Sequence, residues 1–430
     1  MYYVVVVVIL FFCYKILTSK DNALGWYVMG ICLIYNGFHI GPLYSRFLFS
    51  SLLFFRAIID NRFYTVVSKM PLKVEIFVFI IGVLISALMS SSYDIEQKFL
   101  LCFRELLTTI LILPVSYFFL KTSSNSYLFV RSATLSLIIL FAYGLFELIS
   151  GDNLVHNIAI KDFNDYFLSS KEMGDFLKEY DASFGRVRIE SLQCFSFDYG
   201  ICSILLGLLA IFYYEKYRRK EYLIVGLICG LGGGILCGSR SVLLSCVIFY
   251  LLYVSSVFKS INRFVLYATL IIFVAIYSVF GGSTSYYYFM ITDMLNTGGS
   301  NMGGSSVDMR MAQLSAAMDL FSQNPIWGNG PQYLSTLNEN SILKATMLGS
   351  ESYIYKLLIE KGIVGFITNI YFFVSVFRSV IKNRDKKQSH LLVNLTGSFL
   401  LFSLATGVQG AWYIYMPLLA FSLKTSKKYF

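Results

Sequence analysis

Long apolar stretches alternate along the chain with short polar gaps, and two of the polar gaps are much longer than the others. A membrane-spanning helix needs about 20 mostly apolar residues, so we expect about 12 or 13 spanning helices. The stretch 47–59 is short and is expected to be either a span or a re-entrant or interfacial piece. The candidate stretches are 2–17, 24–41, 47–59, 73–91, 99–121, 127–149, 195–214, 222–238, 241–257, 262–282, 353–381, 390–407 and 411–424.

These stretches predict an all-α polytopic integral membrane protein. Inside lipid no water is available to the backbone, so a spanning segment must satisfy its own hydrogen bonds as a helix. We expect a single multi-span membrane domain over residues 1–430, with two long outer loops at 151–194 and 283–352. The first stretch, 2–17, lacks a basic start and a small-residue cleavage site, so it is predicted to be a span and not a signal peptide.

The basic residues indicate which side of the membrane each gap faces. They gather in four places, and all four fall on the same side if the spans alternate. That side is predicted to be the cytoplasm, because cytoplasmic loops are enriched in lysine and arginine. Both long loops then face outward. The four groups are Lys216, Arg218, Arg219 and Lys220; Lys259 and Arg263; Arg378, Lys382, Arg384, Lys386 and Lys387; and Lys424, Lys427 and Lys428.

Composition excludes several classes of protein. A hydrophobic fraction of 57% with only 14% charged residues excludes an ordinary soluble domain. The net charge of +10 lies mostly in the gaps between apolar stretches, so no nucleic-acid partner is expected. The eight cysteines form no C-x-x-C pair and the three histidines lie far apart, so we predict no metal site and no cofactor.

The longest polar gap contains an element with more order than a simple connection needs. A helix is predicted over 307–323, and Asn324-Pro325 ends it, because proline disfavours helix in the residue before it. A Gly-Asn-Gly-Pro turn follows over 328–331. The glycine-rich stretch 298–304 before the helix is expected to let the loop close over a ligand.

Four outward-facing arginines are the candidate binding residues. Arg186 and Arg188 end the first long loop, Arg240 lies in the tight turn 238–241, and Arg310 lies in the large loop. Forked guanidinium donors match phosphate oxygens, so several of them at one site would suit a lipid-linked diphosphate. The alternative is that each arginine anchors a helix end at the headgroup layer. Arg240 fits that alternative least, because outer loops hold fewer basic residues.

Glu351 is the candidate catalytic base. It ends the large loop together with Ser352, where partial desolvation would raise the pKa of its carboxyl group toward a range useful for proton transfer. The alternative is that it caps the following helix, since an acid in the first turn complements the helix dipole. Arg104, Glu105 and Glu147 lie within or near spans, where ionisable groups are often functional, although an internal ion pair would account for them equally well.

Taken in order, these motifs resemble the Wzy-type polysaccharide polymerases and their relatives, the O-antigen ligases. The resemblance covers most of the chain as topology and is specific in four places. The ligases typically carry a His-Asn pair where this chain has Glu351-Ser352, and an acidic residue followed by serine is more like the polymerases. The four places are Arg186/Arg188 before Phe195-Ser-Phe-Asp-Tyr-Gly200, then Gly238-Ser-Arg-Ser241, then Arg310 with Asp319-Leu-Phe-Ser-Gln-Asn-Pro-Ile-Trp-Gly-Asn-Gly-Pro331, and finally Glu351 to Gly365.

The resemblance implies a GT-C-like, metal-independent, inverting glycosyltransferase of the bacterial cytoplasmic (inner) membrane, with its active site facing the periplasm or cell exterior. Two undecaprenyl-diphosphate-linked oligosaccharides would meet there, and a sugar hydroxyl of one would displace the diphosphate of the other. Arg240, Arg310 and one of Arg186/Arg188 would stabilise the leaving diphosphate, with Glu351 as base. Membrane lipid and a chain-length regulator are the other partners that the resemblance implies.

Two other functions stay open from the sequence. An O-antigen ligase would transfer finished polymer from the lipid carrier to lipid A core. A transporter or flippase of lipid-linked oligosaccharide would place polar residues along a path through the membrane and would show an internal repeat. The chain shows no convincing repeat, and its polar sequence concentrates in the two long loops, which favours a transferase over a transporter.

Overall fold

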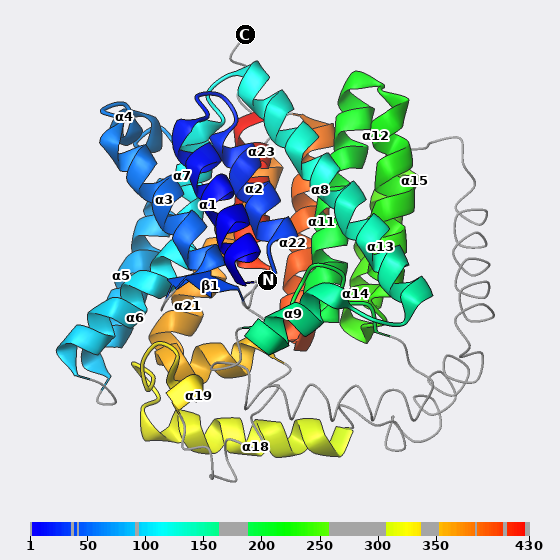
Figure 1. Ribbon diagram of the computed structural model, residues 1–430. Helices are drawn as coiled ribbons and strands as arrows, with labels where there is room; N and C mark the ends of the chain where they lie inside the picture. The colour runs from blue at the N-terminus through cyan, green and yellow to red at the C-terminus, as the bar shows by residue number, and fades with distance from the viewer. Residues whose placement is uncertain are drawn as a thin grey trace.

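The computed structural model describes residues 2–35, 38–40, 43–90, 94–162, 188–257, 307–336, 352–382, 385–406 and 411–425. Within these ranges the chain forms a bundle of helices with one pair of short strands (Figure 1). The elements are α1 (Tyr2–Thr18), α2 (Ala23–Leu33), β1 (His39–Ile40), β2 (Leu43–Tyr44), α3 (Ser45–Ile59), α4 (Phe63–Val67), α5 (Lys73–Met89), α6 (Ile95–Thr108), α7 (Ile112–Phe119), α8 (Ser123–Ser150), α9 (Leu154–Asp162), α11 (Ser196–Tyr217), α12 (Lys220–Val225), η1 (Gly226–Gly230), α13 (Leu231–Leu236), α14 (Arg240–Ser245), η2 (Cys246–Tyr250), α15 (Leu251–Val257), α18 (Val307–Gln323), α19 (Tyr333–Thr336), α21 (Tyr353–Lys382), α22 (Lys386–Thr406) and α23 (Trp412–Thr425).

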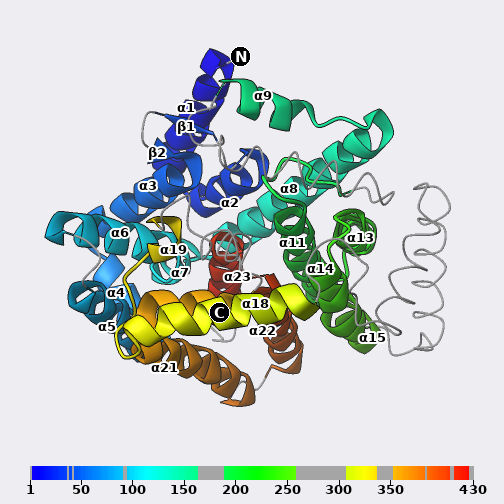
Figure 2. The ribbon, with the colours of Figure 1, turned by 90° about the horizontal axis from the view of Figure 1, so that it is seen from below.

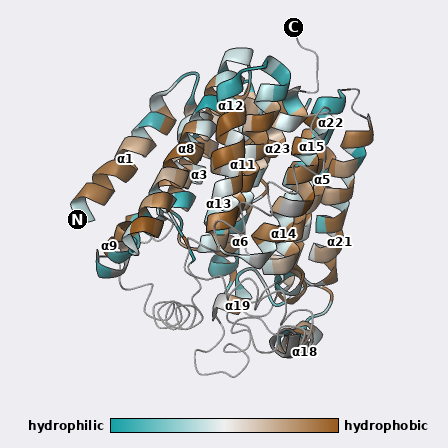
Figure 3. Ribbon diagram, turned by 90° about the vertical axis from the view of Figure 1, so that its right-hand side faces the viewer, coloured by the Kyte–Doolittle hydropathy of each residue, from teal (hydrophilic) through white to brown (hydrophobic). Residues whose placement is uncertain are grey.

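The helices have the length and surface of a membrane bundle. Among the described residues, α8, α11, α21 and α22 are long and apolar enough to cross a membrane. The pair α6 and α7, bent by 41°, meets the same criteria only when taken together, as a broken span or a re-entrant loop. Hydrophobic residues cover the bundle helices along most of their length (Figure 3). The outer face of α1 exposes Val4 at 60% and Val7 at 64%, which suits contact with lipid tails. The chain is therefore an all-α polytopic membrane protein.

The expected number of about 12 or 13 spans stays a prediction, since it rests on the length rule alone. Several candidate stretches are helices shorter than those that pass the spanning test, including α1, α2 and Ser241–Val257. The candidate stretch 262–282 lies outside the described residues, as do the glycines of 298–304.

One predicted span is wrong in its second half. The stretch 24–41 was expected to be a single helix, but α2 ends at Leu33, where Ile34 adopts an extended backbone with φ −93° and ψ 120°. The chain then pairs with itself in two short antiparallel strands, in which His39 faces Tyr44. The helix ends because the following residues find their backbone partners in this strand pair and not in another helical turn.

A second predicted span, 99–121, is bent in the middle. The helix is interrupted after Thr108, and Thr109 has a non-helical backbone with φ −121° and ψ −96°. Pro114 explains the position of the break, because proline lacks the N–H that would bond to Ile110 and its ring would clash with that carbonyl. The break leaves polar backbone near the Thr109 turn, next to the charged residues of α6.

The two ends of the bundle differ in charge. Residues from three of the four basic groups meet at one end, which we call the basic end. Lys387 donates a hydrogen bond to the carbonyl of Glu215 at the end of α11 (3.0 Å), and Lys424 donates to the carbonyl of Tyr117 in α7 (2.9 Å). The fourth group, at 259–263, lies outside the described residues. The helices α9, α18 and α19 lie at the opposite end, which we call the α18 end (Figure 1).

Candidate functional site

The helix α18 crosses the α18 end of the bundle and is fastened at its C-terminal half. Ala316, Ala317 and Leu320 on one face of α18 are buried together with Ile359 of α21. Seen from below, α18 runs from α21 to the region of α14 (Figure 2). Figure 1 shows the same relation from the side, so the N-terminal end of α18, which carries Arg310, lies under the α14 end of the bundle.

The turn after α18 is held against α21 by the backbone. We call this contact, between residues 324–331 and 359–364, the turn clamp. Four of its hydrogen bonds join main-chain atoms, so much of it depends on backbone geometry and not on side-chain type. These four hydrogen bonds run from Asn329 N to Ile359 O (2.8 Å), Gly330 N to Glu360 O (2.9 Å), Ile363 N to Pro325 O (2.9 Å) and Val364 N to Ile326 O (3.2 Å).

Two glycines make the turn clamp possible. Gly362 breaks α21 with φ 61° and ψ −162°, a conformation that is essentially restricted to glycine. A Cβ atom at Gly362 would lie 2.5 Å from the carbonyl oxygen of Ile326 and 2.6 Å from the nitrogen of Gly328. Gly328 has φ 78°, and a Cβ there would collide with the backbone of Glu360 and Lys361. Gly328 of the Asn-Pro-Ile-Trp-Gly-Asn-Gly-Pro run therefore has a structural role.

Asn329 completes the turn clamp from inside. Its side chain is 2% exposed, and its Nδ2 donates to the carbonyls of Leu320 (2.9 Å) and Ile359 (3.2 Å). Asn324 Nδ2 in turn donates to Asn329 Oδ1 (3.1 Å). One buried amide thus joins the end of α18 to the first half of α21, so the Arg310 helix and the broken helix form one unit.

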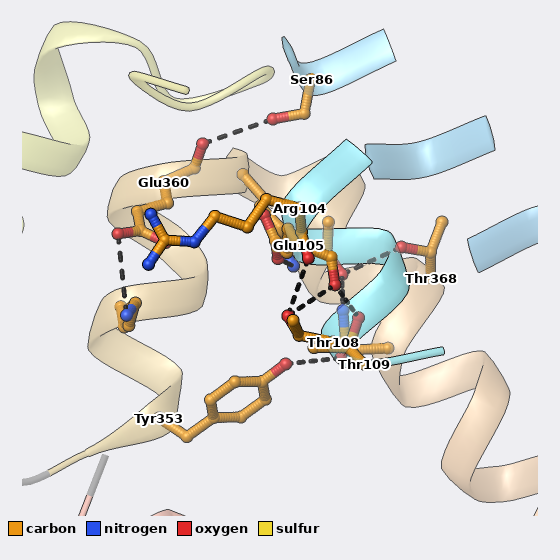
Figure 4. Close-up of polar contacts among 12 residues, drawn as sticks. Ser86, Arg104, Glu105, Thr108, Thr109, Tyr353, Glu360 and Thr368 are labelled. Carbon is orange, nitrogen blue, oxygen red and sulfur yellow. Dashed lines mark hydrogen bonds and ion pairs between the residues drawn. The ribbon is translucent and has the colours of Figure 1, made fainter. Parts of the chain in front are cut away.

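A serine of α5 binds the same unit to the rest of the bundle. Ser86 Oγ lies 2.5 Å from the carbonyl oxygen of Trp327 and 3.3 Å from that of Glu360, and its single O–H has these two acceptors. Figure 4 shows the contact with Glu360. Ser86 is 1% exposed. The contact places the turn clamp against α5 as well as α21.

A buried ion pair lies next to the turn clamp, at Lys361 of α21. Lys361 Nζ pairs with Glu105 Oε1 of α6, and the two side chains are 4% and 3% exposed. The Lys361 ammonium also lies 5.5 Å from the ring centre of Phe79. Glu360, 1% exposed, faces Lys356 at 4.0 Å. An internal ion pair for Glu105 is thus present, but its partner is Lys361, not the adjacent Arg104.

Arg104 instead lies against an aromatic ring. Its guanidinium carbon is 5.3 Å from the ring centre of Tyr44, next to the start of α3. In Figure 4 the Arg104 side chain extends across the cluster on the side of Glu360. Arg104 is half-buried. A guanidinium placed on an aromatic face keeps its charge and its remaining N–H donors.

A second buried charge pair was not found from the sequence. Arg46, at the start of α3, is 3% exposed and donates through Nη2 to Gln193 Oε1 at 2.6 Å. Its Nη1 lies 3.8 Å from Asp198 Oδ2 in the first turn of α11. Gln193 Nε2 donates to the carbonyl of Cys32 at 2.6 Å. The available signal was one arginine and one aspartate at the edges of apolar stretches, where an unpaired charge is costly.

The segment that carries Arg188 is fixed from several sides. Glu147 accepts backbone hydrogen bonds from Ser191 (2.7 Å) and Glu190 (3.3 Å), and Asn153 Nδ2 donates to the carbonyl of Ser191 (2.9 Å). Ser191 itself adopts φ 55°. Glu147 therefore holds the loop through backbone N–H groups, a different role from the ion pair that the sequence offered as one interpretation.

Two of the candidate arginines lie on segments that touch. Ile189, beside Arg188, donates a backbone hydrogen bond to the carbonyl of Leu236 at 3.4 Å, four residues before Arg240. Arg240 is the first residue of α14, after Gly238 with φ 63° and the N-cap Ser239. The side chains of Arg240 and Arg310 lie outside the part of the chain that the structure describes, as do Arg186 and Glu351 entirely.

The comparisons with known proteins point in the same direction as the sequence. A family model described as O-Antigen ligase matches residues 225–370, from η1 through the first part of α21. The matched region therefore includes the Arg240 turn, α18 and the turn clamp. It supports the O-antigen ligase/polymerase superfamily, whose members are membrane glycosyltransferase-like enzymes, and it fits ligases and polymerases equally well. A comparison with the curated proteins found none that matches.

Proposed function

We propose that this protein is a polysaccharide polymerase of the bacterial inner membrane. It would join undecaprenyl-diphosphate-linked oligosaccharide repeat units at the α18 end, on the outer face of the membrane. The observation that carries the proposal is that three arginine-bearing segments lie at that end. The Arg188 segment bonds to the end of α13, Arg240 begins α14, and α18 brings its N-terminal end with Arg310 to the same region.

The chemistry follows from the charge that must be stabilised. When a sugar hydroxyl attacks the anomeric carbon of the donor, the bond to the diphosphate breaks and its electron pair leaves with the diphosphate oxygen. Fixed guanidinium donors stabilise that charge without reorganising during the reaction. Arg240, Arg310 and Arg188 or Arg186 are the proposed donors. Glu351 stays the candidate base of the sequence analysis.

The turn clamp gives this proposal a physical basis. A donor stabilises a transition state only when its position is fixed, since a misplacement of about 1 Å is enough to lower the rate strongly. α18 is fastened to α21 through Asn329 and the backbone, and α21 is fastened to α6 through Lys361 and Glu105. The helix of Arg310 is thereby part of the rigid bundle.

The polymerase and ligase branches differ at the end of the large loop. Glu351-Ser352 stands where the ligases typically carry His-Asn, and this supports the polymerase. The matched family fits the second candidate equally well, an O-antigen ligase that transfers polymer to lipid A core. A chain-length regulator is a further proposed partner of the polymerase.

The test is the surface polysaccharide of a deletion strain that carries wild-type, Arg240→Ala or Arg240→Glu copies. We expect the wild type to restore a ladder of chain lengths and both variants to leave a single repeat unit on the core. Arg219→Ala, at the basic end, is the matched control and should restore the ladder. A bare core with polymer on the lipid carrier would mean the ligase, and a normal ladder from Arg240→Glu would refute the site.

A further inference from the structure

The first long loop brings a histidine and a carboxylate together beside the proposed diphosphate site. His156 lies in α9, and its Nδ1 is 3.0 Å from Glu190 Oε2 and 2.8 Å from the hydroxyl of Tyr35. The side chains of His156 and Glu190 are 14% and 13% exposed. They are thus more accessible than the paired charges Glu105, Asp198 and Lys361, which are nearly fully buried.

We propose that His156, in place of Glu351, is the general base of the glycosyl transfer and that Glu190 is its positioning residue; the proposal otherwise rests on the proposed function. A carboxylate at Nδ1 favours the tautomer that carries its proton on Nδ1, and Nε2 then has the lone pair. The Tyr35 hydroxyl is hydrogen-bonded to the Cys194 thiol, so its oxygen can accept from Nδ1 as well. The same arrangement of nucleophile, base and orienting carboxylate recurs in other enzymes.

The position of the pair fits this role. Glu190 is two residues from Arg188, and Ile189 between them points into the core with 1% exposure while its two neighbours are half-buried. The backbone of Ile189 is bonded to Leu236 and that of Glu190 to Glu147, so the segment cannot slide. The base is thereby held beside the segment whose arginine serves the leaving group.

The reaction step balances without a further reactant. The acceptor hydroxyl gives its proton to His156 Nε2 while its oxygen forms the bond to the anomeric carbon. The bond from that carbon to the donor diphosphate breaks, and the electron pair leaves on the diphosphate oxygen beside the arginines. The imidazolium then releases its proton to water at the outer face, and Glu190 stabilises its transient charge.

The ionisable neighbours of His156 come from three elements. Tyr35 follows α2, Glu190 and Cys194 belong to the loop before α11, and Glu147 lies in α8. Burial raises the pKa of the Cys194 thiol to about 12, so this thiol stays neutral over the working range.

The experiment measures polymerisation in membrane vesicles that hold the full chain. The substrate is the lipid-linked repeat unit extracted from the deletion strain. We expect His156→Gln to lower the rate by about 10²- to 10⁴-fold, the usual contribution of a general base. His390→Gln is the matched control: His390 is exposed in α22, and the change should leave the rate at the wild-type value.

The pH profile separates a base from a structural residue. The wild-type rate should fall in acid, because protonation removes the lone pair that a base needs, and the residual rate of His156→Gln should lack this fall. Glu190→Gln should lower the rate less than His156→Gln does, because it leaves the imidazole in place. In His156→Ala, added imidazole should restore part of the rate.

Binding of geranylgeranyl diphosphate to the purified full chain completes the test. His156→Gln should bind this probe as the wild type does, because the base acts on the acceptor. A wild-type rate in His156→Gln would overturn the inference and leave the polymerase proposal standing. Loss of both rate and probe binding, without rescue by imidazole, would show that His156 is only structural. A wild-type chain that forms no ladder from these units would refute the proposed function itself.

Discussion

The two ends of the bundle hold charge in opposite ways. At the α18 end the pairs Lys361–Glu105 and Arg46–Asp198 are almost completely buried. At the basic end, Arg62 bonds to Asp60 through two N–H donors while 75% of its side chain stays exposed. A hollow of about 310 Å³ there is lined by serines and tyrosines of α8 and α11 together with Phe421. These charged pairs are therefore buried at the α18 end and in contact with water at the basic end, so removing one partner should cost more free energy of unfolding at the α18 end.

The largest expected effect follows from breaking the buried pair. Lys361→Met leaves the Glu105 carboxylate buried without its cation, and such a loss costs about 3–5 kcal/mol. We expect a correspondingly lower free energy of unfolding in mild detergent, measured by thermal or denaturant unfolding. Lys121→Met is the control at the basic end, where an exposed pair is worth about 0–1 kcal/mol. Equal losses in the two variants would contradict the comparison.

The elements around this pair show what the sequence can predict. The end of α18 could be predicted because Asn324-Pro325 is a local signal, and the apolar stretches predicted helices for the same reason. Gly362 gave no such signal: a single glycine inside a predicted helix is no local stop, and only its contact with residues 326 and 328 requires its backbone conformation. The break in α21 was therefore missed.

The residues of the candidate site also differ in whether the local sequence could predict them. Arg240 stood out because an arginine in a tight outer turn is unusual in itself. Arg46 and Lys361 did not, because their partners, Asp198 and Glu105, lie on other helices and only the packed bundle joins them. The His156–Glu190 contact was missed for the same reason, since the two residues are far apart in the sequence and only the folded chain brings them together.

The next effect tests the turn clamp. Gly362→Ala puts a side chain into a backbone conformation that costs about 1–3 kcal/mol and adds close contacts with residues 326 and 328. Gly151→Ala is the matched control: Gly151 has φ 71°, but its Cβ would meet nothing within 4 Å. We expect Gly362→Ala to lower the unfolding midpoint more than Gly151→Ala. The reverse order would mean that the contact with the turn stabilises little.

A smaller effect concerns the amide inside the turn clamp. Asn329→Ala removes donors from buried carbonyls, for which we expect a loss of about 1–3 kcal/mol. Asn157→Ala, which removes an exposed hydrogen bond to Asp152, should cost less than about 0.5 kcal/mol. Unfolding of both variants in the same detergent measures the difference. A stable Asn329→Ala protein would show that the backbone bonds hold the turn without the amide.

The smallest effect belongs to the basic end and depends on pH. The Arg62 side chain, its backbone N–H and then Lys121 hold the pKa of Asp60 below its ordinary value. Because the folded pKa is lowered, the stabilisation is fully present above the unfolded pKa of about 3.9 and is lost gradually as the pH falls from there through the lower folded pKa. Asp60→Asn should therefore cost under about 1 kcal/mol at neutral pH and less than that at pH near 3. Equal costs at both pH values would contradict this assignment.

Because every cysteine is buried, chemical labelling can test which side of the membrane each end of the bundle faces. All eight thiols are buried, so a maleimide reagent that cannot cross a membrane should leave the native chain unlabelled. A cysteine introduced at an exposed position would therefore be labelled without interference from the native cysteines. Met311→Cys on α18, where the native side chain is 60% exposed, and Tyr64→Cys on α4, where it is 82% exposed, would report the two ends separately. Labelling of the first and not the second in intact spheroplasts would assign the α18 end to the outside of the cell.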